Sequence, residues 1–116
     1  MLYHKNLGIP AQLMVVLSGL KVALTFSRHA KMECLHDKRE LIFPPLEVNI
    51  SPSNIVEVDA EGRVINKVLV RFPYSDKSDL LMALIPEPAV NMAHVKTCWL
   101  NDVNDNHATL REERYQ

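Results

Sequence analysis

The feature that most constrains the fold of this chain is a succession of β-type segments between residues 55 and 100. Residues 55–58 are rich in β-branched side chains, and residues 64–72 alternate valines with Lys, Leu and Arg, as a strand with two different faces does. Residues 80–85 are continuously apolar, which is typical of a strand covered on both faces. Residues 94–100 form the last segment. We therefore predict an antiparallel β-meander of about four strands.

The first third of the chain predicts one or two helices. Pro10 stands where helices often begin, and apolar residues then recur at helical spacing at Leu13, Val16, Leu17 and Leu20. Gly19 weakens this helix and could end it. After a short β-type segment at 22–26, Ser27 is an N-cap residue for a helix over 28–36. The predicted class is α+β, a single domain over residues 1–116, with these N-terminal helices covering one face of the meander.

Composition limits the classes of function. The 13 basic and 14 acidic residues nearly balance, so a site for a polyanion must be a local patch rather than a global field. Gln12, Ser18 and Lys21 interrupt the apolar N-terminal run, which we interpret as core rather than as a membrane span. The expected location is the cytoplasm, without membrane association.

The chain contains two cysteines, Cys34 and Cys98, without a CxxC spacing. Their small number favours reduced, partly buried thiols of a cytosolic protein. A disulfide between them would require Cα atoms within about 7 Å, which the sequence leaves open.

The end of the chain is the most polar candidate site. Residues 101–110 carry one imidazole, two carboxylates, three side-chain amides and a hydroxyl directly after the last predicted strand. Strict alternation in that strand would place Val95, Thr97 and Trp99 on one face and Lys96 on the other. Cleavage of RNA without a metal ion needs a base, an acid and fixed cations around the phosphorane. Residues of suitable type are His107, Thr109, Tyr115, Lys96 and Arg71.

Each of these residues also has a simpler interpretation. His107 is of a type that often stabilises a turn, Lys67 is of a type that often lies solvated on a strand, and Thr109 with Glu112 fits a capping box. His29 lies in the first turn of a predicted helix, where the helix dipole disfavours the protonated ring, so it suits a base or a half-buried structural histidine.

Two kinds of metal site are alternatives for these residues. A zinc site would combine His29, His36, His107 and Cys98, but residues seven apart on one helix do not reach the same ion unaided. Asp102 onward resembles a calcium loop, yet His107 stands where the loop needs glycine. We therefore expect no metal and no cofactor.

The order of short motifs resembles that of a known group. Phe26-Ser27-Arg28-His29-Ala30, a β-meander, Val95-Lys96-Thr97 and His107-Ala108-Thr109-Leu110 ahead of Tyr115 resemble small phage and toxin-type domains of the barnase–EndoU–colicin–RelE-like (BECR) ribonucleases. The resemblance covers roughly residues 22–115. It implies a helical N-terminal part on a four-stranded antiparallel sheet, with His29 and His107 in the site, Lys96 or Arg71 at the phosphate, and Thr109 and Tyr115 as hydrogen-bonding support.

The sequence departs from that pattern at one position of the first helix, where Lys31-Met32-Glu33 stands in place of an expected arginine. The leading hypothesis is a toxin-like or phage-encoded, metal-independent endoribonuclease that acts on RNA. The alternative is a non-catalytic phage or accessory protein on the same scaffold that binds or inhibits a host or antitoxin-like protein. A homo-oligomer formed through the helix over residues 13–20 is a further possibility.

Overall fold

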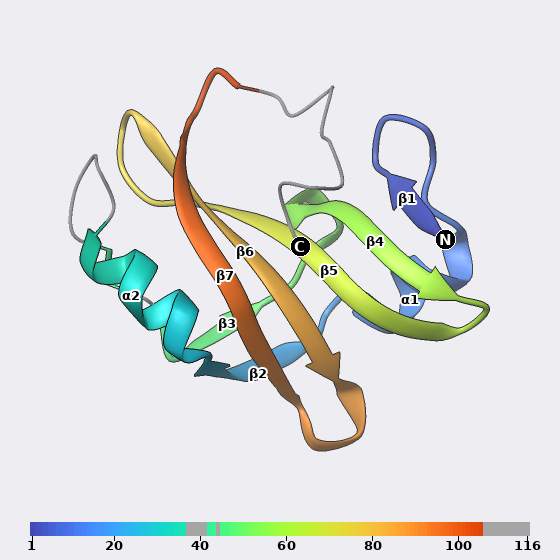
Figure 1. Cartoon of the computed structure of the whole chain (residues 1–116). Helices are drawn as coiled ribbons and strands as arrows, with labels where there is room; N and C mark the ends of the chain where they lie inside the picture. Colours follow the sequence, from blue (N-terminus) through green and yellow to red (C-terminus); the bar gives the residue numbers. More distant parts are fainter. Residues whose placement is uncertain (37–41, 44, 106–116) are drawn as a thin grey trace.

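The computed structural model describes residues 1–36, 42–43 and 45–105, apart from the side chain of His36 (Figure 1). The elements in chain order are β1 (Leu2–His4), α1 (Ala11–Leu17), β2 (Lys21–Phe26), α2 (Arg28–His36), β3 (Glu47–Asn49), the 3-10 turn η1 (Pro52–Asn54), β4 (Ile55–Glu61), β5 (Val64–Pro73), β6 (Ser78–Glu87), the 3-10 turn η2 (Pro88–Val90) and β7 (Met92–Asp102).

Within the described residues, seven strands form one sheet in the order β1-β4-β5-β6-β7-β2-β3. Neighbouring strands are antiparallel except β2 and β7, which are parallel. The prediction of a four-stranded antiparallel meander carrying N-terminal helices is therefore wrong. The meander β4–β7 exists, but it is the inner part of a larger mixed sheet.

The reasons for this error are physical. β1 and β3 have three residues each, too few to show a period of two. Residues 22–26 were recognised as a strand, but their pairing with β7 joins segments about 70 residues apart, and no local pattern encodes such a pairing. Both short strands lie at the sheet edges, where strands of minimal length limit edge-to-edge association.

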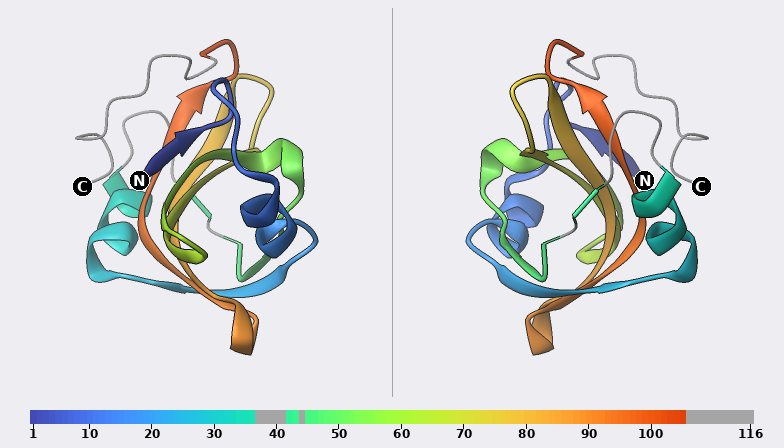
Figure 2. Two further views of the ribbon diagram at one scale, coloured as in Figure 1. Left: turned by 90° about the vertical axis from the view of Figure 1, so that its right-hand side faces the viewer. Right: turned by 90° about the vertical axis from the view of Figure 1, so that its left-hand side faces the viewer.

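The helix predictions are confirmed for the elements but not for their placement. α1 follows Pro10, buries Leu13 and Leu17, and ends before Gly19, whose φ of 80° suits glycine. α2 follows Ser27, and the Ala30 N–H donates to the Ser27 hydroxyl at 3.0 Å, as an N-cap requires. In Figure 2, α1 lies toward the concave side of the strongly curved sheet and α2 lies beside β7.

The main core fills the concave side of the sheet. It joins inward side chains of the strands to Leu13 and Leu17 of α1 and to Ala30 and Cys34 of α2. A smaller apolar cluster forms on the opposite, outer face from Val56, Leu69, Leu81 and Ala83, with Trp99 packed against it.

A β-bulge in β7 changes which side chains face outward. Thr97 pairs with Ala83 but Val95 pairs with Leu84, so Lys96 is an extra residue between two successive pairs. Val95 and Cys98 are consequently both buried in the main core, while Thr97 lies on the outer side. The strict alternation predicted for this strand is wrong at Lys96.

No helix in the described part of the chain is long and apolar enough to cross a membrane.

Candidate functional site

The candidate site lies where α2 runs beside β7. The parallel pairing of β2 with β7 ends at Phe26 and Val95, and α2 flanks the remainder of β7 (Figure 1). Ser27 connects the two elements: its N–H donates to the Val95 carbonyl at 3.0 Å, and its hydroxyl donates to the Lys96 carbonyl at 3.0 Å. The start of α2 is thereby fixed next to the bulge in β7.

Glu33 is the centre of the hydrogen bonding at this edge. Its Oε1 lies 3.1 Å from His29 Nε2, accepts a hydrogen bond from the Thr97 hydroxyl, and lies 3.4 Å from the Cys98 backbone nitrogen. The Cys98 N–H belongs to the part of β7 that β2 does not reach, so Glu33 supplies an acceptor that a neighbouring strand would otherwise offer. We call His29, Glu33, Lys96 and Thr97 the edge cluster.

The geometry gives the two sides of the His29 ring different roles. The Glu33 side chain is 27% exposed and the His29 side chain is 73% exposed, so the carboxylate is anchored while the ring faces solvent. When Nε2–H donates to Glu33, a neutral imidazole keeps its lone pair on Nδ1. Nδ1 is then the atom that can accept a proton from a bound molecule.

Three cationic residues lie at the junction of α2 and β7. Arg28 and Lys31 lie in the first turn of α2 and Lys96 lies at the bulge, and all three are exposed. The start of a helix also carries the positive end of its dipole. A chain with a net charge of −1 therefore has three exposed cations at this junction, any of which is accessible to an anionic ligand.

His94 adds another imidazole on the same strand. Thr25 and His94 are opposite each other in the β2–β7 pairing, and Thr25 Oγ1 lies 2.9 Å from His94 Nδ1. The hydroxyl fixes the orientation of this ring, two residues before Lys96. His94 was predicted only as a strand residue.

Arg71, predicted to bind phosphate, serves an internal role. Its Nε donates to Asp79 Oδ2 at 2.6 Å, Nη2 donates to the Asp102 carbonyl at 2.8 Å, and Nη1 donates to the Asp105 carbonyl. The side chains of Arg71 and Asp79 are only 12% and 18% exposed. We call Arg71, Asp79 and the carbonyls of Asp102 and Asp105 the Arg71 corner. A phosphate at this guanidinium would compete with these contacts.

The residues beyond Asp105 carry three of the predicted site residues. His107, Thr109 and Tyr115 lie outside the described residues, so the expected meeting of His29 with His107 stays a prediction. Within the described part of the loop, Asp102 Oδ1 accepts a hydrogen bond from the Asn104 N–H at 2.8 Å, which makes this carboxylate a turn former.

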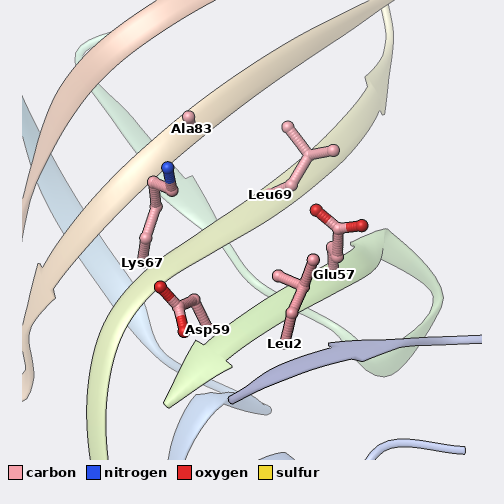
Figure 3. A pocket seen from close by; sticks show the side chains of 6 residues that line it. All are labelled: Leu2, Glu57, Asp59, Lys67, Leu69 and Ala83. Carbon is pink, nitrogen blue, oxygen red and sulfur yellow. The ribbon is translucent and has the colours of Figure 1, made fainter. Parts of the chain in front are cut away.

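A separate small hollow lies on the outer face of the sheet, between β1, β4, β5 and β6 (Figure 3). Its lining residues are Leu2, Glu57, Asp59, Lys67, Leu69 and Ala83. Lys67 is opposite Asp59 in the β4–β5 pairing, and the N-terminal ammonium lies 3.4 Å from Asp59 Oδ1 and donates to the Ala60 carbonyl at 2.7 Å. These contacts tie β1 to the sheet, so we interpret this hollow as structural.

Glu33 is the functional candidate that sequence reasoning missed. Its four-residue spacing from His29 on one helix was a usable signal, because side chains at i and i+4 meet on a helix surface. The contact with Thr97 had no such signal, since it joins residues 64 positions apart.

A comparison of the chain with known protein families, with curated proteins and with solved structures gave no significant match. The resemblance to BECR ribonucleases therefore stays a prediction that rests on the motifs alone.

Proposed function

We propose that the chain is a toxin-like or phage-encoded endoribonuclease domain that cleaves RNA by attack of the 2′-hydroxyl, without a metal ion, at the edge cluster. The observation that carries the proposal is the 3.1 Å contact between His29 Nε2 and Glu33 Oε1 beside the exposed Lys96. A histidine oriented by a carboxylate, next to a cation, is a common arrangement for general-base catalysis on a charged substrate. A cytoplasmic location is part of this proposal.

The proposed reaction assigns one step to each group. His29 Nδ1 takes the proton of the 2′-hydroxyl, and the 2′-oxygen attacks the adjacent phosphorus. The Lys96 ammonium, assisted by the positive end of α2, stabilises the negative charge on the phosphorane oxygens. The P–O5′ bond breaks, a general acid protonates the leaving oxygen, and a 2′,3′-cyclic phosphate remains. His107, expected from the motif, and His94, suggested by its position, are the candidate acids.

The test is cleavage of a 5′-labelled RNA oligonucleotide in EDTA, beside a DNA oligonucleotide of the same sequence. We expect cleavage of RNA only, with cyclic phosphate ends, and a loss of about 100-fold or more in rate for His29→Ala. Comparing His94→Ala with His107→Ala identifies the acid. Lys5→Ala, an exposed lysine after β1, is the matched charge control.

Absence of cleavage by the wild-type protein would end the catalytic proposal. Equal cleavage by wild type and His29→Ala would show that the edge cluster is not the catalytic site. RNA binding without cleavage would instead indicate a domain that has an RNA-binding surface but does not catalyse cleavage.

The second candidate function is a non-catalytic protein that binds a host or antitoxin-like protein or another copy of itself. Apolar exposure at α1 and in the turn before it favours this function: Val15 is 76% exposed and Val16 is 39% exposed on α1, and Leu7 in the turn is 89% exposed. Sedimentation of the wild type and of Val15→Glu distinguishes the self-associating form. A concentration-dependent dimer that Val15→Glu abolishes would support self-association. A monomer at all concentrations would exclude self-association and leave binding to a different protein as the second candidate.

A further inference from the structure

Cys34 of α2 and Cys98 of β7 meet in the core, although 64 positions separate them in sequence. Their Sγ atoms are 3.2 Å apart, and the residues are 4% and 0% exposed. A disulfide has a sulfur–sulfur distance near 2.05 Å, so these two thiols need an approach of only about 1 Å to reach bonding distance.

The contact is held by its surroundings. Glu33, the residue before Cys34, accepts from the Thr97 hydroxyl and lies 3.4 Å from the Cys98 backbone nitrogen. One turn earlier in α2, Ala30 is fully buried and its carbonyl oxygen lies 3.6 Å from Cys98 Sγ. The same contacts that fix α2 on β7 therefore hold the two sulfurs together.

We infer that Cys34 and Cys98 form a redox-sensitive pair that closes an intramolecular disulfide when the protein meets a disulfide oxidant such as oxidised glutathione. The Cys34 thiolate, from the slightly more exposed residue, attacks the oxidant and forms a mixed disulfide, and one glutathione thiolate leaves. The Cys98 thiolate then attacks the Cys34 sulfur and releases the second glutathione thiolate. The two protons lost by the protein thiols are taken up by the two glutathione thiolates, so two protein thiols are oxidised while one glutathione disulfide is reduced.

The crosslink would act on the helix that carries His29 and the strand that carries Lys96. It would join residues on either side of β3 to β6, and it would prevent α2 from leaving β7. This inference is independent of the proposed ribonuclease activity, because it rests on the two sulfurs and their packing alone.

The first measurement is the mass of the intact, full-length protein after incubation with oxidised glutathione, followed by denaturation in the presence of iodoacetamide. We expect a monomer about 2 mass units lighter than the reduced protein, with neither cysteine alkylated. Cys34→Ser and Cys98→Ser, treated in the same way, should each keep one glutathione or become alkylated at the remaining cysteine.

The second measurement needs no variant: the melting temperature of the oxidised wild type against that of the wild type kept in dithiothreitol. Closing so long a loop should raise the melting temperature by about 10 °C or more. Alkylation of both cysteines after oxidation, stable glutathione adducts, or disulfide-linked dimers would overturn the inference. A lower melting temperature for the oxidised protein would show that the crosslink strains the contact, and would equally overturn it.

Discussion

The two cations predicted to bind phosphate, Lys96 and Arg71, have opposite environments in the folded chain. Lys96 is exposed at a β-bulge, where its carbonyl accepts a hydrogen bond from Ser27 at the start of α2, while three N–H groups of Arg71 donate within the protein. Both residues stand in strands with an outward-facing pattern. The difference teaches that the position of a cation in a strand pattern does not say whether its side chain is left to bind a ligand, because the tertiary contacts decide that.

The contrast also separates stability from activity. The Arg71 corner joins β5 to β6, to the last residue of β7 and to the turn after it, so its loss should lower the free energy of unfolding. The edge cluster lies at the surface, apart from the Glu33 carboxylate and its two contacts on β7. Mutations in the Arg71 corner should therefore lower mainly the free energy of unfolding, and mutations in the exposed part of the edge cluster should lower mainly the proposed activity. The following predictions test this difference.

The largest expected effect on stability is that of Arg71→Met. Removing the guanidinium leaves the largely buried Asp79 carboxylate without its Arg71 partner and removes the Arg71 donors from the Asp102 and Asp105 carbonyls. We expect the free energy of unfolding to fall by about 3 kcal/mol, measured by urea denaturation. Arg63→Met, in the exposed turn between β4 and β5, should change it by less than about 0.5 kcal/mol. Equal losses in both variants would mean that the Arg71 corner contributes nothing specific.

The sequence predicted the start of the edge cluster well, because helix starts are local. Ser27 before a helical pattern identified the N-cap, and that cap fixed the position of His29 in the first turn of α2. Val68 and Val70 were likewise assigned to the same face of their strand, and both are buried in the main core. These predictions depend on residues within one turn or one strand of each other.

What the sequence did not predict depends on distant partners. Lys96 was assigned to a face by alternation, yet the bulge opposite Ala83 and Leu84 makes it an extra residue. Arg71 seemed available because Asp79 and the carbonyls after β7 approach it only in the folded chain. The contact between Cys34 and Cys98 likewise depends on α2 lying beside β7, an arrangement that follows from the parallel pairing of β2.

An intermediate effect is expected for Glu33→Ala. The Thr97 hydroxyl and the Cys98 backbone N–H both lose their acceptor, and we expect a loss of about 2 kcal/mol in the free energy of unfolding. Glu33→Gln keeps one oxygen acceptor and should lose less than about half of that. His29→Ala, at a side chain 73% exposed, should leave stability within about 0.5 kcal/mol while removing the proposed activity. A His29→Ala variant as unstable as Glu33→Ala would show that the ring is structural.

The smallest effect on stability, and the sharpest test of the contrast, is that of Lys96→Ala. Its exposed side chain should contribute less than about 0.5 kcal/mol to folding. If it contacts an RNA phosphate, the plot of log affinity against log salt concentration should become shallower by about one, because one fewer counterion is released on binding. Fluorescence anisotropy of a labelled RNA across a salt series measures this slope, with Lys5→Ala as the control at the opposite side of the sheet. An unchanged slope for Lys96→Ala would mean that Lys96 does not contact an RNA phosphate. The same reduced slope for both lysine variants would indicate binding by diffuse charge rather than at the edge cluster.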